Sequence, residues 1–500
     1  MHTRLKCGQL WTRAVAWAAA LGLRWGAAAN TSDVILRGER CWIVARGEPL
    51  TNVLAEFQRL GVAIKTEPGL DRTVNVDLRD QHVERALRAA LGPLDFVVEW
   101  SVLQGPISNV VRVKEIRVFS PGQEQRVRPW IGRRYTVSRG ADGRGPLHIE
   151  REVLVVMRRG VTGRDFLSFL EEWNGSVVDS IPSRGIYRLR LGPGQDALAT
   201  ATRMRQDPRV EVAEANMAIR VPVAMPTPGT GSAAAGAPPV SGVSQAAVAV
   251  LDTGLAVPAG WQPSVVGAWD ATQPGAPVTD PIGHGTQMAL VASGAIVPEH
   301  TPPAAATPVL AIRTFDDQGV TSNFDILRAI QYAADQGARV VSLSWGTDTP
   351  SYFLHEAVSE AQARGMVVVA AAGNEATGRP NYPAAYPGVV AVAGVRGDGQ
   401  RWESSNYGDF VVLAAPAVAQ FPVGYQGPPG RYAGTSTATA YTSAILGQWW
   451  LRNPTASAAE AVDALRQSLS DAGAPGRDPY YGYGVLDAAA VYRFLSSPRP

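Results

Sequence analysis

Four polar residues in the second half of the sequence stand where apolar runs end or where helices are expected to begin. Asp252 ends the run VAVLD, and Asn374 follows the run VVVAAAG. His284 lies between two glycines in PIGHGT, and Ser436 lies in YAGTSTATAY, at the expected start of a helix. Taken singly, an aspartate at a strand end is usually a turn residue and a histidine is usually structural. Only their combination indicates chemistry.

A carboxylate, an imidazole and a hydroxyl in one site can carry out nucleophilic acyl transfer. The hydroxyl attacks a carbonyl carbon, a neutral imidazole takes its proton, and a carboxylate fixes the imidazole tautomer. Asp252, His284 and Ser436 occur in the order acid, base, nucleophile. Turns at strand ends and helix starts could bring the three side chains together, so they are the candidate catalytic residues.

The chain from Ala246 onward alternates between apolar strands and helices. Continuous apolar strands separated by helices predict a parallel sheet that is covered on both faces. Active sites of such sheets collect at the carboxyl ends of the strands. We predict an α/β fold with a doubly wound, mostly parallel sheet. The expected helices include 324–336 and 352–364, and the expected strands are AAVAVL, VLAIRT, RVVSLSW, MVVVAAA, VVAVAG and VVLAA.

Residues 244–490 resemble the subtilisin-like serine peptidases, the subtilases, over nearly their whole length. The motifs around the candidate residues carry the resemblance: DTG at Asp252, HGT at His284, GTS at Ser436 and AAGN at Asn374. Further matches are SWG at 344–346, YPA at 382–384, SNYG at 405–408, AP at 415–416 and the closing segment 481–491. The ordered motifs identify a subtilase-type peptidase domain, which we place at 244–500.

The resemblance implies a role for each residue of the candidate site. Ser436 is expected to attack the peptide carbonyl, and His284 is expected to take its proton and return it to the leaving amine. Asp252 is expected to hold the imidazolium. The side-chain amide of Asn374 and the backbone N–H of Ser436 are expected to bind the oxyanion.

Ser344, Trp345 and Gly346 are the expected substrate-binding residues, because the resemblance implies an extended edge here to which a peptide adds as a strand. The family usually has a leucine where this chain has Trp345. We expect the larger side chain to change the shape of a subsite, so the family's cleavage preference is not carried over.

The residues after the nucleophile also depart from the family pattern. The family usually has Met-Ala-x-Pro, and this chain has Thr-Ala-Thr-Ala at 437–440. Ala440 keeps the helix and restores a backbone N–H that proline would lack. The hydroxyl of Thr437 stands where a thioether normally packs and is expected to loosen the support of the nucleophile. Gln287 replaces a second histidine.

Residues 151–220 predict a small α+β domain of the order β-α-β-β-α-β, which is the ferredoxin-like arrangement. Its last segment, DPRVEVAEANMAIR, resembles the end of subtilase propeptides, so we expect an inhibitory propeptide. Residues 221–243 follow as a Pro/Gly/Ala-rich linker that is open to cleavage. The expected strands are 153–157, 177–181, 186–191 and 210–219, and the expected helices are 165–173 and 197–204.

The first 150 residues divide into three parts. Residues 1–29 have the basic start, short apolar core and small residues that are typical of a secretory signal peptide, which predicts a secreted or periplasmic protein. Residues 40–101 predict another small α+β domain. Within it, residues 42–101 resemble the short N-terminal domain of secretins and TonB-dependent receptors, which implies a protein partner in the cell envelope. Residues 102–150 form a basic connector without a readable fold.

Composition and charge exclude several classes of protein. The 500 residues predict two to four domains, and 46% hydrophobic with 18% charged residues excludes a disordered chain. A net charge of +2 gives no support for a nucleic-acid partner, and two cysteines exclude a cysteine-rich metal site. Residues 30–220 carry 29 basic and 24 acidic residues, whereas residues 221–500 carry 13 and 20. The opposite signs favour docking of the first part on the second.

The leading hypothesis is a serine endopeptidase that is made as a self-processing zymogen, binds its own propeptide and cleaves protein or peptide substrates. The alternative is a weakly active or inactive binding or assembly protein of the cell envelope with the same fold. No cofactor and no metal ligand are predicted. Calcium is common in the family, but no residue-by-residue match assigns a site.

Overall fold

The computed structural model describes residues 32–130, 135–140, 143–228, 247–302 and 305–497, and the chain divides into two compact units. Among the described residues, unit 1 comprises 32–58, 62–100 and 113–130, and unit 2 comprises 59–61, 101–112 and those from 135 onward. The expected signal peptide and residues 229–243 of the expected linker lie outside the described residues. No helix in the described ranges is long and apolar enough to cross a membrane.

In its described residues, unit 1 contains two small sheets and two α-helices. One sheet has the order β1-β2-β4, and the other has the order β5-β6-β3-β7. Strands β6 and β7 lie in the stretch 102–150, whose fold could not be read from the sequence. The elements are β1 (Asp33–Arg37), β2 (Arg40–Pro49), α1 (Leu50–Arg59), β3 (Ala63–Thr66), β4 (Thr73–His82), α2 (Val83–Leu91), β5 (Asp95–Leu103), β6 (Val110–Phe119) and β7 (Arg128–Pro129).

Residues 148–220 of unit 2 form an antiparallel sheet with two helices in the predicted order β-α-β-β-α-β. The strand order β10-β11-β9-β12 is that of the ferredoxin-like fold, which confirms the prediction. Helix α3 begins with a capping box of Thr162 and Asp165, and Phe166 stacks on Tyr187 in the core. The elements are β9 (His148–Met157), α3 (Gly163–Glu172), β10 (Gly175–Ile181), β11 (Ile186–Leu191), α4 (Ala197–Met204) and β12 (Val210–Arg220).

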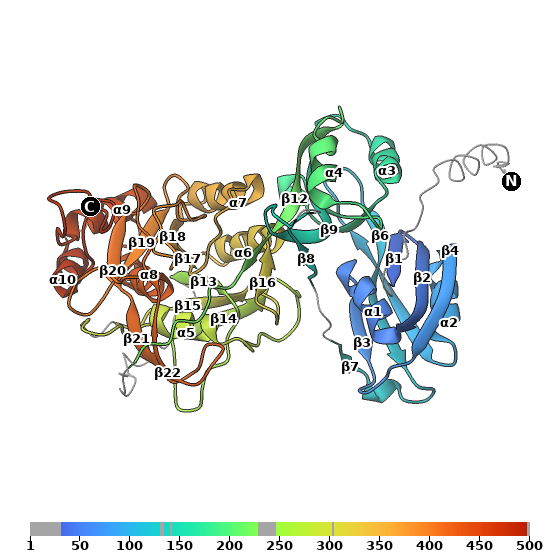
Figure 1. Cartoon of the computed structure of the whole chain (residues 1–500), viewed down its shortest axis with the longest axis horizontal. Helices are drawn as coiled ribbons and strands as arrows, with labels where there is room; N and C mark the ends of the chain where they lie inside the picture. Colours follow the sequence, from blue (N-terminus) through green and yellow to red (C-terminus); the bar gives the residue numbers. More distant parts are fainter. Residues whose placement is uncertain (1–31, 131–134, 141–142, 229–246, 303–304, 498–500) are drawn as a thin grey trace. The chain divides into compact units, whose positions relative to one another are not determined.

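The rest of unit 2 is built on a seven-stranded sheet of order β14-β15-β13-β17-β18-β19-β20 (Figure 1). All neighbouring strands are parallel, so the predicted doubly wound parallel sheet is confirmed. The first strand, β13, has later strands on both sides, which places a topological switch point at its carboxyl end. The strands are β13 (Val248–Asp252), β14 (Val265–Asp270), β15 (Val309–Arg313), β17 (Val340–Leu343), β18 (Val367–Ala371), β19 (Val390–Val395) and β20 (Leu413–Pro416).

Helices cover both faces of this sheet. Helices α5 (His284–Ala292) and α8 (Thr435–Arg452) pack on each other and on the strands, and α6 (Asn323–Asp335) and α7 (Tyr352–Ala363) form a second pair (Figure 1). Every residue of α5, and α8 from Thr435 to Trp450, is buried. The starts of α5 and α8 are therefore held rigidly by the core, which is what a catalytic site requires.

Candidate active site

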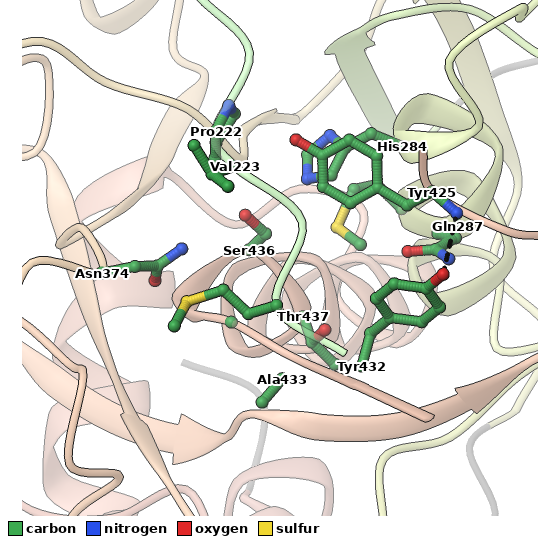
Figure 2. A pocket seen from close by; sticks show the side chains of 13 residues that line it. Pro222, Val223, His284, Gln287, Asn374, Tyr425, Tyr432, Ala433, Ser436 and Thr437 are labelled. Atoms are coloured by element: carbon green, nitrogen blue, oxygen red, sulfur yellow. Dashed lines mark hydrogen bonds between the residues drawn. The ribbon is translucent and has the colours of Figure 1, made fainter. Parts of the chain in front are cut away.

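The four residues singled out from the sequence lie together at the end of the parallel sheet that is formed by the carboxyl ends of its strands. Asp252 is the last residue of β13, and Asn374 follows β18 by three residues. His284 is the first residue of α5, and Ser436 is the second residue of α8. In Figure 2, Ser436 lies between His284 and Asn374. The predicted residues thus share a single site at the carboxyl ends of the strands.

The acid and the base form a short, buried hydrogen bond. His284 Nδ1 lies 2.6 Å from Asp252 Oδ1, and the two residues are 2% and 1% exposed. The backbone N–H of Thr253 also donates to this oxygen at 2.8 Å, which fixes the carboxylate. A carboxylate can only accept here, so Nδ1 carries the proton and Nε2 is left to accept one.

Asp280 orders the loop that joins the acid to the base. Its Oδ1 accepts from Thr253 Oγ1 at 2.8 Å and from the N–H of Gly283 at 2.8 Å. Its Oδ2 accepts from the N–H and the hydroxyl of Thr286 at 2.8 and 2.6 Å. The sequence reasoning missed this residue. The available signal was an aspartate four residues before His284 in a glycine-flanked stretch, where loop carboxylates commonly accept backbone N–H bonds.

The hydroxyl of the nucleophile is directed at a backbone carbonyl. Ser436 Oγ donates to the Ser344 oxygen at 3.0 Å, and Ser344 Oγ donates back to the Ser436 oxygen at 3.2 Å. Among the described residues no hydrogen bond joins Ser436 to His284. The hydroxyl must therefore leave Ser344 before it can donate its proton to the imidazole.

The side-chain amide of Asn374 is oriented by the residue before the nucleophile. Asn374 Oδ1 accepts from the N–H of Thr435 at 3.0 Å and from its hydroxyl at 2.8 Å. The amide nitrogen is consequently turned toward Ser436 (Figure 2). N–H groups in the first turn of a helix have no intrahelical acceptor, so the Ser436 N–H can be a second donor. The two groups can together bind an oxyanion.

The expected effect of Trp345 on a substrate subsite is not what the structure shows. Its side chain is 1% exposed, packs against Phe315 and donates from Nε1 to the Leu251 oxygen at 2.7 Å. Pairing of β13 with β17 ends before Leu251, and the indole satisfies this carbonyl instead. The larger side chain thus fills the core beside the acid, and any contribution to substrate binding comes from its backbone.

The other residues that depart from the family pattern lie on α5 and α8, and three side-chain hydroxyls of α8 are satisfied by the backbone of the helix. Thr439, Thr442 and Ser443 of α8 each donate to the carbonyl four residues earlier at 2.8 Å. Thr437 is 2% exposed and lines the pocket beside Ser436. Gln287 Nε2 donates to the Val423 oxygen at 2.9 Å.

The chain segment after β12 runs across the site. β12 pairs with β16 (Val320–Ser322), and the N–H of Val221 donates to the Gly319 oxygen at 2.9 Å. Further on, the Met225 oxygen accepts from the N–H of Ala433, at the end of β22 (Gly430–Ala433), at 3.1 Å. Between these two anchors, Pro222 and Val223 line one pocket with His284, Asn374 and Ser436 (Figure 2).

Ion pairs join residues 148–220 to helices α6 and α7. In some the basic residue belongs to 148–220, and in another the acidic residue does. Arg184 lies 3.1 Å from Glu356 and also pairs with Glu360, as the expected docking of a basic part on an acidic part requires. Arg328 donates to Asp179 at 2.7 Å with the signs reversed. In each of these ion pairs, a charged side chain of residues 148–220 therefore meets the opposite charge on α6 or α7.

Two residues of β12 also bind the starts of these helices. Glu214 accepts from Ser351 Oγ at 2.6 Å and from the N–H of Tyr352 at 3.2 Å, at the start of α7. Asn216 accepts from the N–H of Phe324, at the start of α6, at 3.3 Å. Burial raises the pKa of the Glu214 carboxyl above its ordinary value, although its hydrogen bonds act in the opposite direction.

A bound metal ion would need several ligating side chains close together. Within the described residues, no group of three or more His, Cys, Asp and Glu side chains is arranged to hold a metal ion. The described side chains do not supply a carboxylate-rich calcium site.

Comparisons with known proteins agree with this geometry. A sequence model described as the subtilase family matches residues 244–484, and one described as the fervidolysin N-terminal prodomain matches residues 140–216. Thermitase of Thermoactinomyces vulgaris is 36% identical over 211 residues, which cover 41% of this chain and 74% of thermitase. Subtilisin Savinase of Lederbergia lenta is 31% identical over 254 residues, which cover 49% of this chain and 90% of that protein.

Two further matches cover less of the related protein. The minor extracellular protease Epr of Bacillus subtilis (strain 168) is 30% identical over 249 residues, which cover 49% of this chain and 38% of Epr. The crystal structure of fervidolysin, a keratinolytic enzyme from Fervidobacterium pennivorans, aligns with a TM-score of 0.57 and 23% identity. That alignment covers 73% of this chain and 64% of fervidolysin, and it shows a shared fold.

Proposed function

The chain belongs to the subtilase family, and we propose that it is a serine endopeptidase that is made as a self-processing zymogen. The observation that carries the proposal is the buried 2.6 Å bond between His284 and Asp252, at the edge of the sheet where Ser436 and Asn374 also lie. Its substrates are proteins or peptides. Secretion or export to the periplasm by a leader at 1–29 is part of the proposal.

The positions of the four side chains support the following reaction. Ser436 Oγ turns from Ser344, attacks the scissile carbonyl carbon and gives its proton to His284 Nε2, while Asp252 stabilises the imidazolium. The carbonyl oxygen takes the negative charge and accepts from Asn374 Nδ2 and the Ser436 N–H. The imidazolium then protonates the leaving amine, the C–N bond breaks, and water hydrolyses the acyl-enzyme by the same proton transfers.

The path of residues 221–227 supports self-processing. The segment is held at its first residue by Gly319 and at its other end by β22, where the N–H of Thr227 also donates to the Arg431 oxygen at 2.9 Å. Backbone pairing with neighbouring segments is how an extended substrate peptide is held. We place the first cut between Val221 and Met225, after which residues 148–220 stay bound as an inhibitor until they dissociate.

Replacing the nucleophile tests the proposal. Intact-mass analysis of the wild type should show a processed chain, and Ser436→Ala should stay full length and lose casein cleavage by several orders of magnitude. Ser443→Ala is the matched control, because it removes a buried hydroxyl from the same helix. A wild type that stays full length and does not react with a fluorophosphonate probe would contradict the proposal.

The rival function is an inactive binding protein of the cell envelope. The observation that favours it is the Ser436 hydroxyl, which donates to Ser344 and not to His284. The same experiment separates the two functions, since equal behaviour of the wild type and Ser436→Ala would support binding without catalysis.

A further inference from the structure

A loop outside every motif of the sequence analysis packs against the start of α5. This loop, residues 422–429, joins β21 (Val418–Phe421) to β22. The N–H of Gln426 donates to the Ile282 oxygen at 3.1 Å, and Nε2 of Gln287, the fourth residue of α5, donates to the Val423 oxygen at 2.9 Å. Gly283 has φ 93°, and a Cβ there would lie 2.0 Å from the Gly424 oxygen, so only glycine allows this approach.

The loop brings Tyr425 against the catalytic imidazole. The ring centroids of Tyr425 and His284 are 4.7 Å apart with 52° between their planes, and Tyr425 is 4% exposed (Figure 2). The N–H of Tyr425 donates to the Tyr432 hydroxyl at 3.3 Å, and that hydroxyl donates to the Pro428 oxygen at 2.6 Å. The tyrosine is therefore fixed by its own loop and by β22.

The contact gives the imidazole a second point of support besides the bond from Nδ1 to Asp252. A single hydrogen bond at Nδ1 fixes one atom of the ring but allows the ring to swing about it. On the proposed function, we propose that Tyr425 is a positioning residue whose ring keeps His284 in the orientation where Nδ1 meets Asp252 and Nε2 faces Ser436. A displacement of about 1 Å in such a group can cost on the order of 100-fold in rate.

The ring carries this role, and the hydroxyl does not. The Tyr425 hydroxyl is buried and makes no hydrogen bond within the described part of the chain. Burial, with the negative charges of Asp252 and Asp280 nearby, raises its pKa, so the hydroxyl stays neutral and does not act as a base. Phenylalanine at position 425 should therefore preserve the positioning of His284, whereas alanine should not.

Steady-state kinetics give the first test. Tyr425→Phe should keep kcat within about 3-fold, whereas Tyr425→Ala should lower kcat roughly 10- to 100-fold with KM nearly unchanged. The control Tyr441→Ala removes another buried tyrosine, which does not line the pocket, and should change kcat little. An equal loss of kcat in Tyr425→Ala and Tyr441→Ala, or in Tyr425→Phe and Tyr425→Ala, would overturn the proposal.

A second test does not depend on activity. In the Ser436→Ala full chain, the rate at which diethyl pyrocarbonate modifies each histidine can be followed by peptide mass spectrometry. Tyr425→Ala should speed modification of His284 several-fold but leave His148, which is 1% exposed, unchanged. An unchanged rate at His284, or an equal rise at His148, would overturn the positioning role. An inactive wild type would contradict the proposed function, but the rate of modification of His284 could still be measured.

Discussion

The His284–Asp252 pair and the contact of residues 148–220 with helices α6 and α7 are both polar, but they use polar groups differently. The pair is at most 2% exposed, and hydrogen bonds from His284 Nδ1 and from the N–H of Thr253 both fix Asp252 Oδ1. At the contact, each helix start has a cap of its own, from Ser322 for α6 and Ser351 for α7. Glu214 and Asn216 add to those caps.

This difference means that the geometry of the His284–Asp252 pair is permanent, whereas the contact of residues 148–220 with α6 and α7 can be broken. When residues 148–220 leave, Ser322 and Ser351 still cap their helices and water can take the place of Glu214 and Asn216. No such substitute exists for Asp252, because water cannot fix the tautomer of His284. Substitutions in the centre should therefore act on rate, and substitutions at the contact should act on stability and release.

Asp252→Asn should give the largest effect. An asparagine amide in place of the carboxylate can donate to Nδ1 and so stabilises the wrong imidazole tautomer, which is expected to lower kcat by about 10⁴-fold. The measurement is kcat with a peptide substrate, using enzyme freed from residues 1–228 by an added protease if self-processing stops.

Asp270→Asn is the matched control for that substitution. Asp270 is 3% exposed and accepts from the N–H and hydroxyl of Thr272 at 2.8 and 2.6 Å, and no hydrogen bond within the described residues joins it to His284. It should lower the melting temperature but leave kcat within a few fold. Similar losses of kcat in both variants would mean that Asp252 is no more important for the rate than another buried carboxylate of the same sheet.

Asn374→Ala should have the next largest effect, because it removes one oxyanion donor. The expected loss in kcat is about 10²- to 10³-fold with little change in KM, since the donor acts on charge that develops in the transition state. Asn453→Ala is the control, as it removes a buried asparagine at the other end of α8. A rise in KM with unchanged kcat would mean that Asn374 binds the substrate and not the transition state.

Elements with a continuous apolar pattern could be predicted from the sequence. The bounds of β11 and α4 coincide with the predicted ranges 186–191 and 197–204, because apolar spacing and a helix cap define them locally. The edge strand β14 was not predicted. Its residues VVGAWD are mostly apolar, but Gly267 interrupts the run, and most of them are only partly buried.

The candidate site could be predicted only as far as short motifs reach. The triad and Asn374 lie in such motifs, and the structure brings them together. The contact of Tyr425 with His284 joins two loops that are far apart in the chain, so no local pattern announces it. The direction of Trp345 depends on which neighbour lacks a hydrogen bond at the end of β13, and this is a property of the assembled sheet.

Glu214→Gln should give the smallest effect, and it tests the contact of residues 148–220 with α7. Its pKa is raised in the folded chain, so the native state binds more protons than the unfolded state just above the ordinary pKa of a glutamate. The stability that Glu214 contributes is present at lower pH and declines as the pH rises through the raised pKa. Glu214→Gln does not titrate. In the Ser436→Ala full chain, its melting temperature relative to that of Glu214 should therefore increase between pH 4 and pH 7, by about 1–3 °C.

The control for this pH dependence is Glu150→Gln, a change of the same charge at an exposed position of β9. It lacks the contact with α7 and should give a nearly constant difference in melting temperature over the same range. If Glu214→Gln were destabilising by the same amount at every pH, the carboxylate would act only as a hydrogen-bond acceptor for α7. Glu214 leaves with residues 148–220, so the processed enzyme should have the same kcat whether it matured from the wild type or from Glu214→Gln. A lower kcat after maturation from Glu214→Gln would mean that the contact with α7 shapes the catalytic geometry while the chain folds, and the separation drawn between the two regions would fail.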